Sequence, residues 1–219
     1  MSYRQPARRA RRSPSTILTG LIVVSAALAA LLSVFVLQSV VSSSCSAASP
    51  IDLLPVDHHG APPKLTAVAR VEDGAIPSGV TVFDDQYPAV ANLDPDLLTA
   101  LRQAATAASD EGIELYANSG WRSPQYQAVL FDEAVSECGS AQGAAHWVAT
   151  ADTSAHVRGT AIDLGPVDAT TWLAENGSGY GLCQIYVNEP WHYELRPDAV
   201  EHGCPDMYVD PTHDPRMQE

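Results

Sequence analysis

The stretch Ser154–Leu164, with the sequence S-A-H-V-R-G-T-A-I-D-L, decides the fold and the chemistry expected of this chain. It predicts a turn followed by a short apolar strand, with the imidazole of His156 at one end and the carboxylate of Asp163 at the other. A carboxylate inside an apolar strand is costly unless it is paired or bound to a metal. The stretch therefore indicates either a buried ion pair or half of a metal site.

A second stretch, Asn188–Leu195, has the sequence N-E-P-W-H-Y-E-L and supplies another carboxylate and another imidazole, those of Glu189 and His192. Two histidines and one aspartate are enough to hold a zinc ion and leave one position open for water. Zinc lowers the pKa of bound water to ~7, and a spare glutamate can then take its proton. We expect His156, Asp163 and His192 as zinc ligands and Glu189 as the base.

Each of these residues also has a simpler explanation when taken alone. His156 suits a surface or structural role, and Asp163 could be a capping or salt-bridged carboxylate. Glu189 and His192 could be two edge charges on an aromatic core strand. The presence of all four in one small domain favours the metal site over these separate explanations.

Around the two stretches, the sequence predicts helices first and strands later. A helix is expected from a cap at Asp94 to Gly112, a second from Ser123 to Cys138, and a short third over 168–175. Strand character is expected at 79–83, 113–118, 160–164, 185–187 and 191–195, with a loop at 139–143 and a surface tail from Arg196 onward. Because helices and strands do not alternate regularly, we expect an α+β fold with a small, mostly antiparallel sheet and flanking helices.

The N-terminal part predicts a membrane segment. A basic stretch, 1–16, precedes a run without ionisable side chains, 17–41, which is long enough to span a bilayer. We expect a single-pass signal anchor with its basic side in the cytoplasm. A linker over 42–63 would then lead to an extracytoplasmic domain over 64–219. The alternative is a secreted protein released by signal cleavage within the small residues that follow the apolar run.

Charge and cysteines restrict the partners and the compartment. The net charge is -14, and the first twelve residues already hold five of the 12 basic side chains against no acid, so the remainder is strongly acidic. Such a surface repels nucleic acid. Disulfides persist in exported domains. Our preferred pair is Cys183–Cys204, because these cysteines flank the second stretch; Cys138 would pair with Cys45 or stay free.

The two motifs together resemble a known family. S-x-H-x-x-G-x-A-x-D followed by E-x-W-H is similar to the VanX/VanY-like zinc D-alanyl-D-alanine peptidases, over about 94–196. The resemblance implies an α+β domain whose antiparallel sheet carries the metal, with zinc on His156, Asp163 and His192 and with Glu189 as the catalytic base. It also implies that Arg122, in S-G-W-R-S, points at the reacting carbonyl.

Two further residues are candidate substrate contacts. Ser154 matches the serine of the motif, which implies that it touches substrate. Arg158 could bind a substrate carboxylate bidentately, or it could instead brace Asp152.

The resemblance implies a zinc carboxypeptidase that trims peptidoglycan stem peptides ending in D-Ala-D-Ala. Together with the expected membrane anchor, this places the reaction outside the membrane, and we expect the protein to be a monomer. Alternatives are a D,D-dipeptidase, an L,D-carboxypeptidase or endopeptidase of the cell wall, or a non-catalytic wall-binding domain stabilised by zinc. Since both Glu189 and Arg122 are present, an enzyme is favoured over the non-catalytic domain.

Overall fold

The computed structural model describes residues 70–217. The expected membrane segment over 17–41, its basic flank, the linker over 42–63 and Cys45 lie outside the described residues. Among residues 70–217, no helix combines the length and the apolar character that crossing a bilayer requires.

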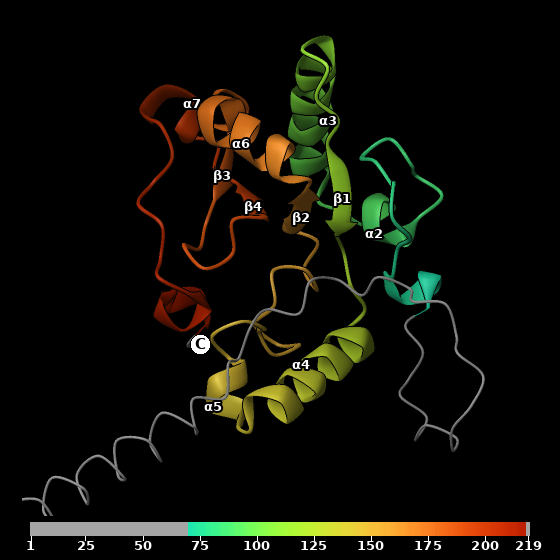
Figure 1. The fold of residues 1–219 in the computed structure, drawn as a ribbon, viewed down its shortest axis with the longest axis vertical. Coiled ribbons are helices and arrows are strands. Elements are labelled where there is room, and N and C mark those ends of the chain that lie inside the picture. Colours follow the sequence, from blue (N-terminus) through green and yellow to red (C-terminus); the bar gives the residue numbers. More distant parts are fainter. Residues whose placement is uncertain (1–69, 218–219) are drawn as a thin grey trace, which may run out of the picture. The chain divides into compact units, whose positions relative to one another are not determined.

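The centre of the fold is a four-stranded antiparallel sheet, as expected, with the strand order β1-β2-β4-β3 (Figure 1). Its strands are β1 (Tyr116–Ser119), β2 (Ala161–Gly165), β3 (Leu182–Gln184) and β4 (His192–Leu195). Every residue of β2 is buried, because this strand is paired on both sides. The register places Asp163 opposite His192 on β4 and opposite Ser119 on β1. Strand pairing therefore brings the two sequence motifs together.

Among residues 70–217, three helices have at least ten residues, and short turns of helix fill the connections. The long ones are α3 (Pro95–Asp110), α4 (Pro124–Cys138) and α6 (Val167–Asn176). The short ones are α2 (Pro88–Ala91), α5 (Ala141–Ala144), α7 (Ala199–His202), η1 (Val71–Asp73), η2 (Gly177–Tyr180), η3 (Pro211–His213) and η4 (Pro215–Met217). Figure 1 shows α3 and α6 beside the sheet, whereas α4 and α5 lie together below it.

Local signals explain where the two predicted long helices begin. Asp94 caps α3 by accepting hydrogen bonds from the backbone N–H groups of Asp96 and Leu97, and Pro95 occupies the first turn. Ser123 caps α4 in the same way through Tyr126, again with a proline at the next position. Both helices were predicted from these signals, and both are confirmed.

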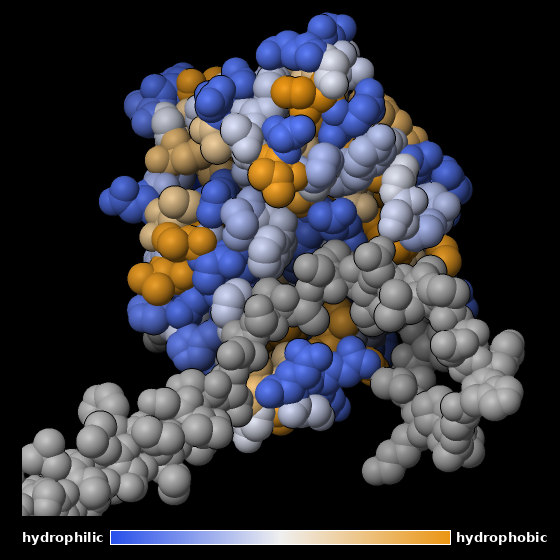
Figure 2. Space-filling view, viewed as in Figure 1, coloured by the Kyte–Doolittle hydropathy of each residue, from blue (hydrophilic) through white to orange (hydrophobic). Residues whose placement is uncertain are grey.

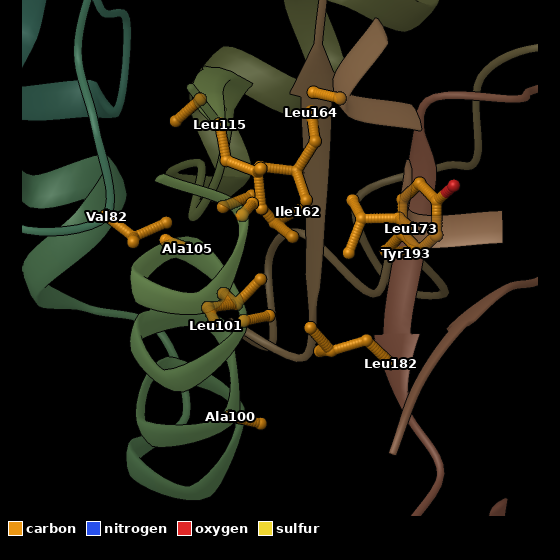
Figure 3. Close-up of a cluster of buried hydrophobic side chains, with 14 of the residues drawn as sticks. Val82, Ala100, Leu101, Ala105, Leu115, Ile162, Leu164, Leu173, Leu182 and Tyr193 are labelled. Atoms are coloured by element: carbon orange, nitrogen blue, oxygen red, sulfur yellow. The ribbon is translucent and has the colours of Figure 1, made fainter. Parts of the chain in front are cut away.

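The hydrophobic core forms between α3, α6 and the sheet. One face of α3 buries a stripe of apolar side chains, which are Leu97, Ala100, Leu101, Ala104, Ala105 and Ala108. Ile162 and Leu164 of β2 and Tyr193 of β4 meet this stripe in a single cluster (Figure 3). The core therefore lies directly behind the strands that carry the two motifs. On the outer surface shown in Figure 2, the described residues are mostly hydrophilic, with small separate apolar areas.

Several expected boundaries are wrong. Strand β1 starts later than 113, because the N–H of Ile113 donates to the carbonyl of Ala108 and closes the end of α3. The expected strand at 185–187 is displaced to β3, Leu182–Gln184. The expected loop at 139–143 contains α5, which Ser140 caps. The expected strand at 79–83 is reduced to one bridge, between Thr81 and Tyr116.

The C-terminal tail differs most from expectation. Instead of only following the surface, it buries Asp210, Pro211 and Asp214 against the domain. The preferred disulfide is confirmed: Cys183 and Cys204 are bonded, with 5.6 Å between their Cα atoms. Cys138 is disulfide-bonded as well, which excludes the alternative that it is a free thiol. The disulfide ties the start of the tail to β3.

Candidate metal centre

Three polar side chains converge where β2 and β4 pair. His156 lies in the turn before β2, Asp163 lies within β2, and His192 opens β4. Asp163 Oδ1 is 3.4 Å from His156 Nε2 and 3.3 Å from His192 Nδ1. All three side chains are buried, and one potential ligand atom from each lies within 4.8 Å of the others. Within residues 70–217, this is the one such group that could hold a metal ion.

The donor atoms fit a zinc ion. Zinc binds histidine nitrogen and carboxylate oxygen at about 2.0–2.1 Å in tetrahedral geometry, which separates neighbouring ligand atoms by about 3.3 Å. The two separations from Asp163 Oδ1 have this length. In addition, Asp163 Oδ1 is buried and accepts no hydrogen bond, which is costly for a carboxylate oxygen unless a cation binds it. The three side chains are therefore placed as a zinc site requires, and their role as ligands stays a prediction.

Each histidine is oriented through its other ring nitrogen. His156 Nδ1 donates to the carbonyl oxygen of Gly120 at 2.8 Å, which leaves Nε2 free to face Asp163. His192 Nε2 lies 3.3 Å from Glu194 Oε1, which leaves Nδ1 on the same side. Metal-binding histidines characteristically donate their second N–H to a carbonyl or carboxylate. Burial and the charge of Arg122 lower the pKa of His156, which favours the neutral imidazole that a metal requires.

Arg122 is fixed beside these three side chains. Its Nη2 donates to Asp163 Oδ2 at 2.9 Å, Nε donates to Ser119 Oγ at 2.7 Å, and Nη1 donates to Gln127 Oε1 at 3.1 Å. Burial raises the pKa of Asp163, but His156, His192 and Arg122 outweigh burial and hold this pKa well below its usual value. Asp163 thus uses one oxygen for Arg122 and keeps the other for the centre.

Glu189 lies at the edge of the same centre, in the turn before β4. Its Oε2 is 3.7 Å from His192 Nδ1, and its Oε1 is buried without a hydrogen-bond partner. Burial is the main reason why its pKa is raised to about 7. A carboxylate with this pKa can both accept and return a proton near neutral pH.

The two expected substrate contacts lie at different places. Ser154 is buried, and its Oγ accepts a hydrogen bond from the N–H of Val157, within the turn that carries His156. Arg158 is exposed and donates to the carbonyl of Thr153. Among residues 70–217 it forms no ion pair with Asp152. Ser154 is therefore part of the buried turn that carries His156, whereas Arg158 lies on the surface.

Sequence reasoning missed two side chains that support the centre. Glu194 follows His192 by two positions on a strand, so both point to the same face, and this spacing could have revealed it. Gln127, on α4, accepts from Arg122 and donates to the carbonyl of Ala149. No local pattern marks Gln127, because its partners are brought to it by tertiary folding.

Comparison with known proteins relates residues 90–198 to a described family. The family model described as "VanY: D-alanyl-D-alanine carboxypeptidase" matches residues 90–198. A D-alanyl-D-alanine carboxypeptidase of Enterococcus faecalis (strain ATCC 700802 / V583) is 30% identical over 143 residues, covering 54% of this chain and 53% of the relative. The chain therefore spans about half the length of this curated relative.

Solved structures with similarity to the chain include VanYB in complex with D-alanine-D-alanine, at 29% identity and TM-score 0.46, covering 51% of this chain and 74% of that one. The LdcB LD-carboxypeptidase is similar at 28% identity and TM-score 0.47, covering 58% and 70%. The matched residues, 90–198, include both motifs and all four residues of the centre. Through residues 90–198, the chain belongs to the VanY family of D-alanyl-D-alanine carboxypeptidases.

Proposed function

We propose that this protein is a zinc-dependent D,D-carboxypeptidase that removes the terminal D-alanine from peptidoglycan stem peptides ending in D-Ala-D-Ala. Family membership and the name of the Enterococcus faecalis relative support the substrate class. The observation that carries the proposal is the buried, partnerless Oε1 of Glu189 beside three convergent donors. A purely structural zinc site has no use for such a carboxylate.

In this proposal, His156, Asp163 and His192 hold the zinc ion. Zinc supplies Lewis-acid chemistry, because it lowers the pKa of water and polarises a carbonyl oxygen. Glu189 accepts the proton of the attacking water and later donates it to the amine of the departing D-alanine. In the metal-free protein, burial raises the pKa of Glu189 to about 7, which makes it a stronger base than an exposed carboxylate.

Arg122 would stabilise the developing charge on the carbonyl oxygen. A guanidinium has five N–H donors, and three of those of Arg122 are used by Ser119, Gln127 and Asp163. The remaining two donors belong to nitrogens that are already fixed in place. A donor that needs no rearrangement during the reaction is the kind that lowers a barrier most.

We also propose that the domain acts outside the membrane, as a monomer anchored by the apolar run over 17–41. The alternative is release after signal cleavage. Fractionation of cells that express the full chain distinguishes the two, because an anchored protein stays with the membrane and a cleaved one is found in the medium.

The substitution Glu189→Gln tests the function. It keeps the size of the side chain but removes the proton acceptor, so bound zinc should remain stoichiometric while hydrolysis of a pentapeptide stem falls by about 10²-fold or more. Glu175→Gln, on the exposed face of α6, is the matched control and should leave both unchanged. Undiminished hydrolysis in Glu189→Gln would show that the base is another group.

The substrates of the same assay separate the alternative specificities. Mass analysis should show loss of one D-alanine from the pentapeptide, and chelator should abolish it. Hydrolysis of free D-Ala-D-Ala would indicate a D,D-dipeptidase, and shortening of a tetrapeptide stem would indicate an L,D-carboxypeptidase. Cleavage between cross-linked stems would indicate an endopeptidase. Zinc binding without any product would favour the non-catalytic wall-binding domain.

A further inference from the structure

We propose that the C-terminal segment Asp210–Met217 is part of the support of the metal centre, and that Arg216 is a positioning residue that fixes His192 through Glu194. The inference rests on the proposed function in one respect, namely that His192 is a metal ligand. Arg216 and its partner Asp214 lie beyond residue 198, where the family match ends. The family match therefore does not cover this support.

The first link joins His192 to Glu194. These residues are two apart on β4, so their side chains lie on the same face of the strand. Glu194 Oε1 lies 3.3 Å from His192 Nε2, and the Glu194 side chain is only 1% exposed. Whatever holds this carboxylate therefore sets the orientation of the imidazole and of the Nδ1 atom that faces Asp163.

The second link joins Glu194 to Arg216. Arg216 Nη1 donates to Glu194 Oε2 at 2.6 Å, and Nη2 donates to Oε1 at 3.3 Å. This two-point contact fixes the plane of the carboxylate, which a single charge cannot do. Arg196 adds one contact, from Nη2 to Oε2 at 2.9 Å. Without Arg216, Arg196 would be the one remaining guanidinium, among the described residues, beside the buried charge of Glu194.

The third link holds Arg216 itself. Asp214 is 0% exposed and accepts hydrogen bonds from the backbone N–H and the Nε of Arg216, both at 3.0 Å, with a further contact from Nη2. The hydroxyl of Tyr186 donates to Asp214 Oδ2 at 2.9 Å. The ring of Tyr186 packs against that of His192, with 5.1 Å between the centroids. The segment thus reaches His192 from two directions.

The chain that leads into this segment is also anchored. Tyr208 donates its N–H to the carbonyl of Ile185 at 2.9 Å and accepts from the N–H of Val187 at 2.9 Å. The disulfide between Cys183 and Cys204 fixes the chain just before this pairing. These anchors place Arg216 at Glu194 reproducibly, as a positioning role requires.

The test compares three variants of the full chain. Arg216→Met removes the guanidinium, Arg216→Lys keeps the charge but not the two-point contact, and Arg102→Met is the matched control. Arg102 also forms an ion pair and a backbone hydrogen bond, but with Asp85 and Val82, which are not part of the centre. Zinc affinity is measured by competition with a chromophoric chelator. The visible absorption spectrum of the cobalt-substituted protein reports the ligand geometry.

We expect Arg216→Met to weaken zinc binding by about 10–100-fold, the usual effect of losing a partner of a metal-binding histidine, and to shift the cobalt spectrum. Arg216→Lys should give a smaller loss of affinity, and Arg102→Met should match the parent. A folded Arg216→Met protein with the affinity and spectrum of the parent would overturn the proposal. If Arg216→Met does not unfold cooperatively, the test rests on Arg216→Lys. An Arg216→Lys protein with the zinc affinity and the cobalt spectrum of the parent would then overturn the proposal.

The outcomes also separate this inference from the proposed function. A parent protein that binds no zinc would overturn the metal assignment and this inference with it. A parent that binds zinc but hydrolyses no D-Ala-D-Ala peptide would overturn only the proposed activity, because the role of Arg216 is measured on metal binding alone.

Discussion

Replacing Gly74 by alanine should disturb the candidate active site from a position that touches no substrate. Gly74 follows η1 with a φ of 101°, and a Cβ there would overlap the carbonyl oxygen of Trp121 and lie 3.0 Å from the Cα of Arg122. The left-handed backbone costs an alanine about 1–2 kcal/mol, and the overlap adds about 1–3 kcal/mol. We therefore expect the free energy of unfolding to fall by about 2–5 kcal/mol.

The same change should reduce catalysis, because relief of the overlap moves the backbone that carries Arg122. Two backbone hydrogen bonds hold this part of the chain. The N–H of Ser123 donates to the carbonyl of Asp73 in η1 at 2.8 Å, and the N–H of Arg122 donates to the carbonyl of His156 at 3.2 Å. A displacement of about 1 Å at a catalytic group can cost about 10²-fold in rate. Urea unfolding and hydrolysis of a D-Ala-D-Ala-terminated peptide measure the two effects.

Gly79→Ala is the matched control for this experiment. Gly79 also has a positive φ, 85°, but a Cβ there would meet nothing within 4 Å. It should lose only the backbone contribution of about 1–2 kcal/mol and keep its activity. If Gly74→Ala loses no more stability than Gly79→Ala and hydrolyses the peptide at the parental rate, the close approach of η1 to Arg122 does not position that residue.

Three further outcomes are expected. Asp163→Asn should abolish stoichiometric zinc, measured by metal analysis, because it removes the anionic donor and leaves Arg122 without its carboxylate; retained zinc would contradict the ligand assignment. Replacing both Cys183 and Cys204 by alanine should lower the free energy of unfolding by about 3 kcal/mol, the usual value for a loop of this length, and an unchanged urea midpoint would argue against it. In the metal-free protein, burial lowers the pKa of His192, but Asp163 and Glu194 outweigh burial and raise it from 6.5 to about 10. The folded state therefore keeps a proton that the unfolded chain loses, so the free energy of unfolding should decrease between about pH 6.5 and 10, and urea titrations in chelator that show an increase would contradict this.

The parts of the fold that were predictable from sequence depend on local chemistry. Asp94 with Pro95, and Ser123 with Pro124, mark the starts of α3 and α4 through capping that any sequence with these residues can form. The convergence of His156, Asp163 and His192 was predictable for a different reason. Asp163 in an apolar strand requires compensation, and the family motifs indicated which residues provide it.

The parts that were missed depend on tertiary contacts. The predicted strand at 185–187 was wrong because these residues resemble a strand in sequence but lie outside the sheet. Tyr186 and Val187 pair instead with the tail at Tyr208. The burial of Asp214 was unpredictable from its Pro- and Asp-rich surroundings, which resemble a solvated tail. Its partner Tyr186 lies 28 positions earlier in the chain and becomes a neighbour only when the tail folds back on the domain.

The disulfide between Cys183 and Cys204 has a consequence for proteolytic damage. The segment from Pro197 to Cys204 is largely exposed and offers a protease several peptide bonds. A nick there would not detach the C-terminal fragment, because Cys204 keeps it covalently joined to β3. Nicked protein should migrate as one species until a reductant is added, and Arg216 should remain in place for as long as the bond does.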